Sequence, residues 1–134
     1  MDRSTSIRSL ASAITAARPD DSFSSSVVAS RGGNFTLSLS DTTRGWTETV
    51  TQKLKSAKLG SAEAIAEAPS SSGGVLPLAD FGTANFSGAK VNGSSMASLS
   101  GLDPITMATS SGTVEAKPSA MSSSGSFSDT WYSQ

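Results

Sequence analysis

The sequence runs Asn34-Phe35-Thr36-Leu37-Ser38-Leu39-Ser40 in its first third. Apolar and hydroxyl side chains alternate there, and this period of two is typical of a β-strand with one buried face. Segments 23–29 and 46–54 lie on either side, and the turns at 31–33 and 41–45 contain glycine. We therefore expect a meander of three antiparallel strands.

The second half of the chain repeats this pattern over shorter distances. Residues 75–85 are the most apolar part, and Pro77 within them favours a sheet edge or a bulge, because proline has no N–H to donate. Segments 105–107 and 114–116 flank a Ser-Ser-Gly turn, and residues 127–132 alternate in a terminal strand. Eight or nine short strands at this spacing predict an all-β fold, an antiparallel β-sandwich.

Length and charge limit the protein classes. The chain has 134 residues, which is enough for one domain or for one half of a larger sandwich. Its net charge is −1 and no basic stripe is present, so we expect no nucleic-acid partner. We also expect no membrane partner, since no apolar run approaches the roughly 20 residues that span a bilayer.

Cysteine and histidine are both absent. This excludes disulfides, Ser-His-Asp and Cys-His catalysis, and the common zinc sites. The acidic residues have no EF-hand spacing, and we expect neither a metal nor a cofactor. An enzyme with this composition would use Asp or Glu as its acid or base.

Residues 1–20 differ from the rest. Ile7, Leu10 and Ile14 fall at roughly helical spacing before Pro19. Polar residues interrupt the apolar run that a signal peptide would need. We expect a short helix or a disordered tail over 1–20, no secretion signal, and a β-sandwich over 21–134.

Two glutamates four residues apart are the first candidates for chemistry. The sequence around them is Ala62-Glu63-Ala64-Ile65-Ala66-Glu67-Ala68-Pro69. Propensity is compatible with a two-turn helix and with a strand. In a strand, Glu63 and Glu67 share one face but lie about 13 Å apart, which is too far for a shared-proton pair. A catalytic partner would have to come from elsewhere.

A second interpretation rests on aromatic residues. Trp46, Trp131 and Tyr132 could stack on sugars in a non-catalytic sandwich module that binds carbohydrate or protein, or they could serve packing.

From Asp21 onward the chain resembles the glutamic peptidases (eqolisins), specifically their C-terminal half. The stretch 62–69 resembles the family's Ala-Glu-Trp-Ile-x-Glu block. The stretch 76–83, Leu-Pro-Leu-Ala-Asp-Phe-Gly-Thr, resembles its Leu-Ala-Asp-Phe-Gly strand. A weaker match covers 105–107, 118–119 and 127–131.

The resemblance implies a concanavalin-like sandwich and favours a strand over 62–67. It also implies a secreted, pepstatin-insensitive acid endopeptidase that hydrolyses polypeptides. Glu67 matches the catalytic glutamate and would be the general base that activates water. Glu63 would be a supporting neighbour.

Two departures from the family pattern shape the expectation. Ala64 replaces the tryptophan of the block, and the Gln-Thr-Gly motif that stabilises the oxyanion is absent. The chain is therefore expected to be truncated and inactive alone. Exposed sheet edges would then pair with the N-terminal half or with another copy.

Overall fold

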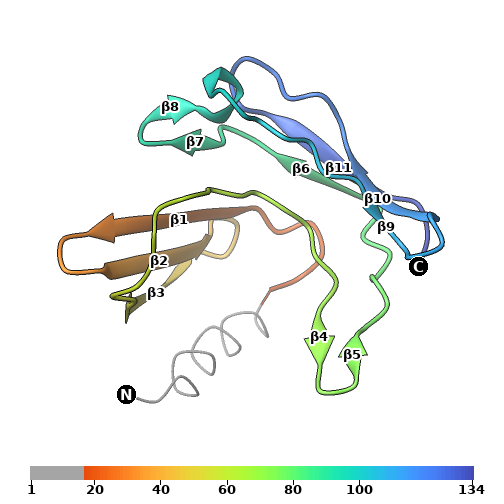
Figure 1. Cartoon of the computed structure of the whole chain (residues 1–134), viewed down its shortest axis with the longest axis horizontal. Coiled ribbons are helices and arrows are strands. Elements are labelled where there is room, and N and C mark those ends of the chain that lie inside the picture. The colour runs from red at the N-terminus through yellow and green to blue at the C-terminus, as the bar shows by residue number, and fades with distance from the viewer. Residues whose placement is uncertain (1–16) are drawn as a thin grey trace. The chain divides into compact units, whose positions relative to one another are not determined.

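The computed structural model describes residues 17–134. The chain divides into two compact units, Met1–Gly60 and Ser61–Gln134, each with antiparallel sheets of its own. Figure 1 labels the strands of both. The helix or tail expected over 1–20 falls almost wholly outside the described residues, so the boundary between 1–20 and 21–134 stays a prediction.

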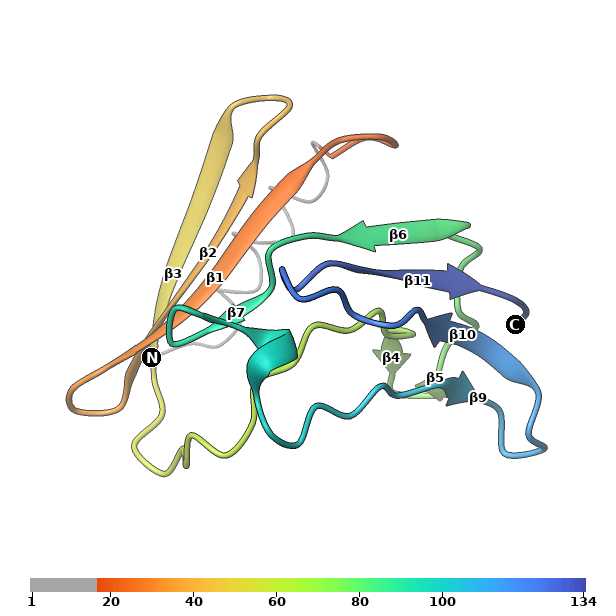
Figure 2. The same cartoon turned by 90° about the horizontal axis from the view of Figure 1, so that it is seen from above.

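The first unit is a three-stranded meander. Its strands are β1 (Phe23–Ser30), β2 (Asn34–Asp41) and β3 (Trp46–Lys53), in the order β1-β2-β3 (Figure 2). The turn before β2 uses Gly33 at a φ of 73°, and a Cβ there would lie 2.9 Å from the carbonyl oxygen of Leu54. Only glycine fits this turn without strain. The meander expected from the sequence is confirmed.

The two faces of this sheet have different chemistry. On one face, three hydroxyl pairs cross from β2 to β3: Thr36 with Thr51 at 3.4 Å, Ser38 with Thr49 at 3.2 Å, and Ser40 with Thr47 at 2.8 Å. The other face carries the apolar residues of β2, which are only half-buried. Phe23 packs edge-to-face on Trp46 there, with ring centroids 6.1 Å apart. Within this unit, hydrogen bonds rather than a closed apolar interior join the strands.

The second unit consists of short strands. They are β4 (Ser70–Ser71), β5 (Gly74–Val75), β6 (Thr83–Phe86), β7 (Lys90–Val91), β8 (Ser94–Ser95), β9 (Met107–Ala108), β10 (Val114–Pro118) and β11 (Phe127–Trp131), with a 3₁₀ turn η1 (Met96–Ser98). A four-stranded sheet has the order β6-β11-β10-β9, and β4–β5 and β7–β8 form two hairpins (Figure 1). Among residues 17–134, no helix is long and apolar enough to cross a membrane.

The core of the second unit lies on one face of the four-stranded sheet. Ala116 is 2% exposed and lies opposite Trp131 in the ladder between β10 and β11. Ala68 and Leu78, from the segments before β6, pack with Ala116, and Phe81, Met107 and Trp131 border this cluster. At the far end of the sheet, Phe86 and Phe127 stack at 4.6 Å.

The strand expected over 75–85 is only partly present. The structure has β5 at its start and β6 at its end, with no strand over 76–82. Pro77 cannot donate to a ladder, and Asp80 accepts the N–H of Gly82 through Oδ1 at 2.9 Å. This side-chain bond turns the backbone locally and competes with strand pairing.

Candidate functional site

The segment that carries the two glutamates, 61–69, contains neither helix nor strand. The strand predicted over 62–67 is therefore wrong, because no neighbouring strand forms a ladder with these residues. The predicted alternation of side chains holds from Glu63 to Glu67, whereas Ala62, expected on the face of Ala64 and Ala66, is exposed. Glu63 and Glu67 are exposed together with Ile65, whereas Ala64 and Ala66 are half-buried. This alternation places the carboxylates on the solvent side of the segment.

Two contacts fix the end of this segment. Ala68 is 9% exposed and belongs to the core cluster with Leu78 and Ala116. One residue later, the carbonyl of Pro69 accepts the N–H of Leu76 at 2.8 Å and closes the hairpin β4–β5. Glu67 directly precedes this anchor, so its backbone is held while its side chain extends to solvent. Glu63 is further from the anchor, and its carboxylate accepts a hydrogen bond from the Ser61 hydroxyl at 3.3 Å.

The Leu-Ala-Asp-Phe-Gly block is anchored on the same core. Trp131 donates its backbone N–H to the carbonyl of Gly82 at 2.8 Å and its indole N–H to the carbonyl of Leu78 at 3.4 Å. Leu78 also packs with Ala68. The two blocks that the sequence analysis singled out therefore meet in one cluster of the second unit.

The sequence pattern of the Peptidase A4 family matches residues 8–131, which is nearly the whole chain. The chain belongs to the Peptidase A4 family. Among solved structures, aspergilloglutamic peptidase from Aspergillus niger matches with a TM-score of 0.68 and 24% identity, over 87% of this chain and 69% of that chain. No curated protein sequence gives a significant match.

Membership in the Peptidase A4 family confirms the resemblance to glutamic peptidases. The structural match shows the fold, so the antiparallel β-sandwich class expected from the sequence is also confirmed. The roles of Glu67 and Glu63 stay predictions. The sequence has two glutamines, Gln52 in β3 and Gln134 in the second unit, and neither lies in a Gln-Thr-Gly motif.

Metal binding has no visible basis in the part of the chain that the structure describes. No three acidic side chains converge there as ligands.

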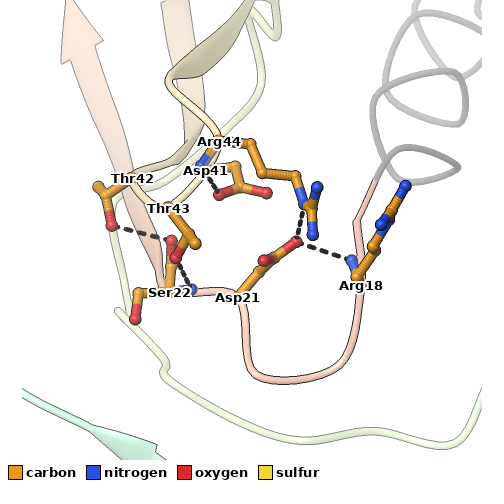
Figure 3. Close-up of polar contacts among 7 residues, drawn as sticks. All are labelled: Arg18, Asp21, Ser22, Asp41, Thr42, Thr43 and Arg44. Atoms are coloured by element: carbon orange, nitrogen blue, oxygen red, sulfur yellow. Dashed lines mark hydrogen bonds and ion pairs between the residues drawn. The ribbon is translucent and has the colours of Figure 1, made fainter.

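A polar cluster in the first unit escaped the sequence analysis (Figure 3). Arg44, in the turn after β2, donates through Nε to the Asp21 carboxylate, which also accepts the N–H of Arg18 at 2.8 Å. Asp41, only 1% exposed, accepts the N–H of Arg44 at 2.8 Å. The turn Asp41-Thr42-Thr43-Arg44-Gly45 carried the signal, since Asp at the first turn position often accepts such a bond.

Charge in this cluster is balanced by arginine. The hydrogen bond from Arg44 lowers the pKa of Asp21 and outweighs the opposing effect of burial, and the N–H of Arg18 adds a smaller lowering. The same ion pair raises the pKa of Arg44. Together with the bonds of Ser22 to Thr42 and Thr43, this ion pair ties the start of β1 to the β2–β3 turn.

Asp129 in the second unit is a buried acid without an arginine beside it. It lies in β11, is 7% exposed, and its Oδ1 has no hydrogen-bond partner among the described residues. Burial raises the pKa of Asp129, and the backbone N–H of Thr130 counteracts part of this rise. The sequence contained the signal, because Asp129 alternates in phase with Phe127 and Trp131, which places it on an apolar face.

The aromatic residues give little support to a sugar-stacking platform. Trp46 packs on Phe23 in the first unit, and Trp131 borders the core of the second. Tyr132, at 57% exposed, points to the opposite side of its strand from Trp131.

Proposed function

We propose that the chain provides the catalytic carboxylate of a glutamic endopeptidase that acts on polypeptides. Glu67 is the general base: it takes a proton from the water that attacks the peptide carbonyl, and it returns a proton to the leaving amine. The proposal includes work at acid pH, insensitivity to pepstatin, and secretion, as the family resemblance implies.

The position of Glu67 carries this proposal. Its side chain is exposed, yet the next residue, Ala68, is buried in the core that also holds the Leu-Ala-Asp-Phe-Gly block. A general base needs access to water and substrate together with a fixed backbone, because misplacement by about 1 Å can cost a hundredfold in rate. Glu63 has the same access but lies further from the anchor, which is why it is assigned only a supporting role.

Hydrolysis also needs a group that stabilises the oxyanion. We propose that a second polypeptide with a Gln-Thr-Gly motif supplies it and that this chain alone does not cleave. The exposed edge of β1 suits such a partner, since Phe23–Ser30 contains no charged residue and is exposed along its length. Uncharged edges add strands readily, whereas β3, at the other edge, carries Glu48 and Lys53.

The test compares two glutamates that lie four residues apart. Wild type, Glu67→Gln and Glu63→Gln are incubated with an unfolded protein substrate at about pH 3–4, where a carboxylate exchanges protons. Each is assayed alone and with a polypeptide carrying the Gln-Thr-Gly motif, in the presence and absence of pepstatin. Loss of a general base lowers the rate by roughly 10²–10⁴-fold, and we expect this for Glu67→Gln and a much smaller loss for Glu63→Gln.

Absence of cleavage by the wild type in both arms would refute the enzymatic function. Equal losses in the two variants would refute the separate roles of Glu67 and Glu63.

Binding of a partner at the edge of β1 is tested separately. Sedimentation velocity of the chain alone detects pairing between copies, and sedimentation with the motif-bearing polypeptide detects the mixed complex. Ser26→Lys on β1 should abolish whichever complex forms, because lysine on an edge opposes strand addition. The matched change Thr49→Lys on β3 should leave it intact, and the reverse pattern would refute the choice of β1.

A further inference from the structure

The acid in the terminal strand lies among apolar neighbours. β11 is an inner strand, between β6 and β10 (Figure 2). Asp129 lies opposite Ala84 of β6 and Pro118 of β10, and neither side chain offers a hydrogen-bond donor. With 7% exposure and an unpartnered Oδ1, a charged carboxylate here has lost most of its hydration, and the backbone N–H of Thr130 replaces only part of it.

Positive charge is scarce around this position. β6 carries no ionisable side chain. On β10, Lys117 alternates onto the face opposite to Ala116 and Pro118, and Glu115, at an irregularity of the ladder, brings a carboxylate and no cation. Tyr132 likewise alternates away from Asp129. The segments that pack on the core face bring only the exposed carboxylates Glu67 and Asp80.

The net charge of the second unit also disfavours ionisation of Asp129. Residues 61–134 contain six acidic residues against Lys90 and Lys117, with no arginine. Both lysines are exposed. The negative excess therefore adds to the free-energy cost of placing a further charge on Asp129.

We propose that Asp129 is a built-in acid switch: its carboxyl is neutral in the folded second unit, and its ionisation loosens that unit as the pH rises. Protonation removes the buried charge and leaves a hydroxyl that can donate within the site. This inference concerns folding stability and holds whether or not Glu67 is catalytic.

The direction of the pH effect follows from linkage. Burial raises the pKa of Asp129 in the folded chain above its value of about 3.9 in the unfolded chain. Its full contribution to stability is present below the unfolded pKa and is lost as the pH rises through the folded pKa. Between these two values, the folding equilibrium constant falls about tenfold for each pH unit.

The experiment uses the tryptophans as separate reporters, because Trp46 lies in the first unit and Trp131 in the second. In a Trp46→Phe background, urea unfolding of the full chain is followed by Trp131 fluorescence at a series of pH values from about 3 to 7, spanning the carboxyl range. We compare Asp129, Asp129→Asn and Asp129→Val. The control is Asp103→Asn, which removes an exposed carboxyl from the same unit.

With Asp129 the urea midpoint should fall as the pH rises, and the Asn and Val variants should lose most of this dependence. Asp103→Asn should retain it. Val suits a strand and an apolar face, so it also tests the proposal should Asn fail to fold. A midpoint that falls equally in the chain with Asp129 and in the variants at 129 would overturn the proposal, as would equal flattening by Asp103→Asn.

Discussion

The two units of this chain are held together by different means. In the described part of the first unit, the one fully buried side chain is Asp41; in the second, Ala68, Leu78 and Ala116 are buried along with Asp129. Both units thus contain a buried aspartate with one carboxylate oxygen that has no hydrogen-bond partner among the described residues, Oδ2 of Asp41 and Oδ1 of Asp129, but only the first unit has an arginine beside its acids. Arg44 bonds to Asp21 through its side chain and to Asp41 through its backbone, whereas Asp129 lies among apolar residues.

The surroundings of a carboxylate determine whether its ionised or its neutral form is favoured. An arginine and backbone N–H groups favour the ionised form, and burial without a cation favours the neutral form. The first unit should therefore be stabilised by ionisation of Asp21 and the second by protonation of Asp129. For a protein that works in acid, as we propose, the unit carrying Glu67 is the one that benefits.

The largest effect is expected from the small core of the second unit. Leu78→Ala removes the largest buried apolar side chain, and Leu→Ala changes in cores typically cost about 2–5 kcal/mol. Urea unfolding followed by Trp131 fluorescence measures this loss. The matched change Leu59→Ala in the first unit, at a leucine that is 77% exposed, should stay within about 0.5 kcal/mol. If Leu78→Ala and Leu59→Ala lowered the free energy of unfolding by similar amounts, the apolar cluster around Leu78 would not be what stabilises the second unit.

A smaller effect is expected at the buried acid of the first unit. Asp41→Ala removes the acceptor of the Arg44 N–H and should cost about 0.5–1.5 kcal/mol, since a part-buried turn hydrogen bond is lost. Asp41→Asn keeps an oxygen acceptor and should cost less. Fluorescence of Trp46, the ladder partner of Asp41, reports the unfolding in a Trp131→Phe background. If Asp41→Asn lowers the free energy of unfolding as much as Asp41→Ala does, the charge of Asp41 and not its hydrogen bond to Arg44 stabilises the turn.

How much the sequence predicted depended on the range of the interactions involved. The meander was predictable because alternation in 34–40 and the flanking glycine turns are local signals. The segment 62–67 was predicted as a strand and is not one, because a strand needs a neighbour, and neighbours are set by the tertiary fold. The exposure of Glu67 and the half-burial of Ala66 were still predicted correctly, because they follow from the alternation of side chains alone.

The polar cluster was missed for the same reason. Asp21 and Arg44 are 23 residues apart and meet only because β1 and β2 pair in register, with Phe23 opposite Asp41. Only the short-range bond within the 41–45 turn could have been inferred from spacing. The place of Asp129 on an apolar face was local information, but the absence of a side-chain donor opposite it depends on Ala84 of β6 and Pro118 of β10.

The smallest effect, and the most direct check on the comparison, concerns Asp21. Arg44 lowers the pKa of Asp21 in the folded chain, so the stability from this ion pair is present above the unfolded value of about 3.9 and is lost as the pH falls through the folded value. Asp21→Asn should therefore reduce the acid sensitivity of the first unit, read through Trp46 in the Trp131→Phe background. Asp20→Asn, at an exposed neighbour, is the matched control. Added salt should weaken the contribution of the ion pair, because the Arg44 side chain is 33% exposed and ions in solution screen its charge. The sign of the pH dependence must be opposite to that at Asp129; the same sign in both units would mean that overall charge, and not the surroundings of each aspartate, governs the response to acid.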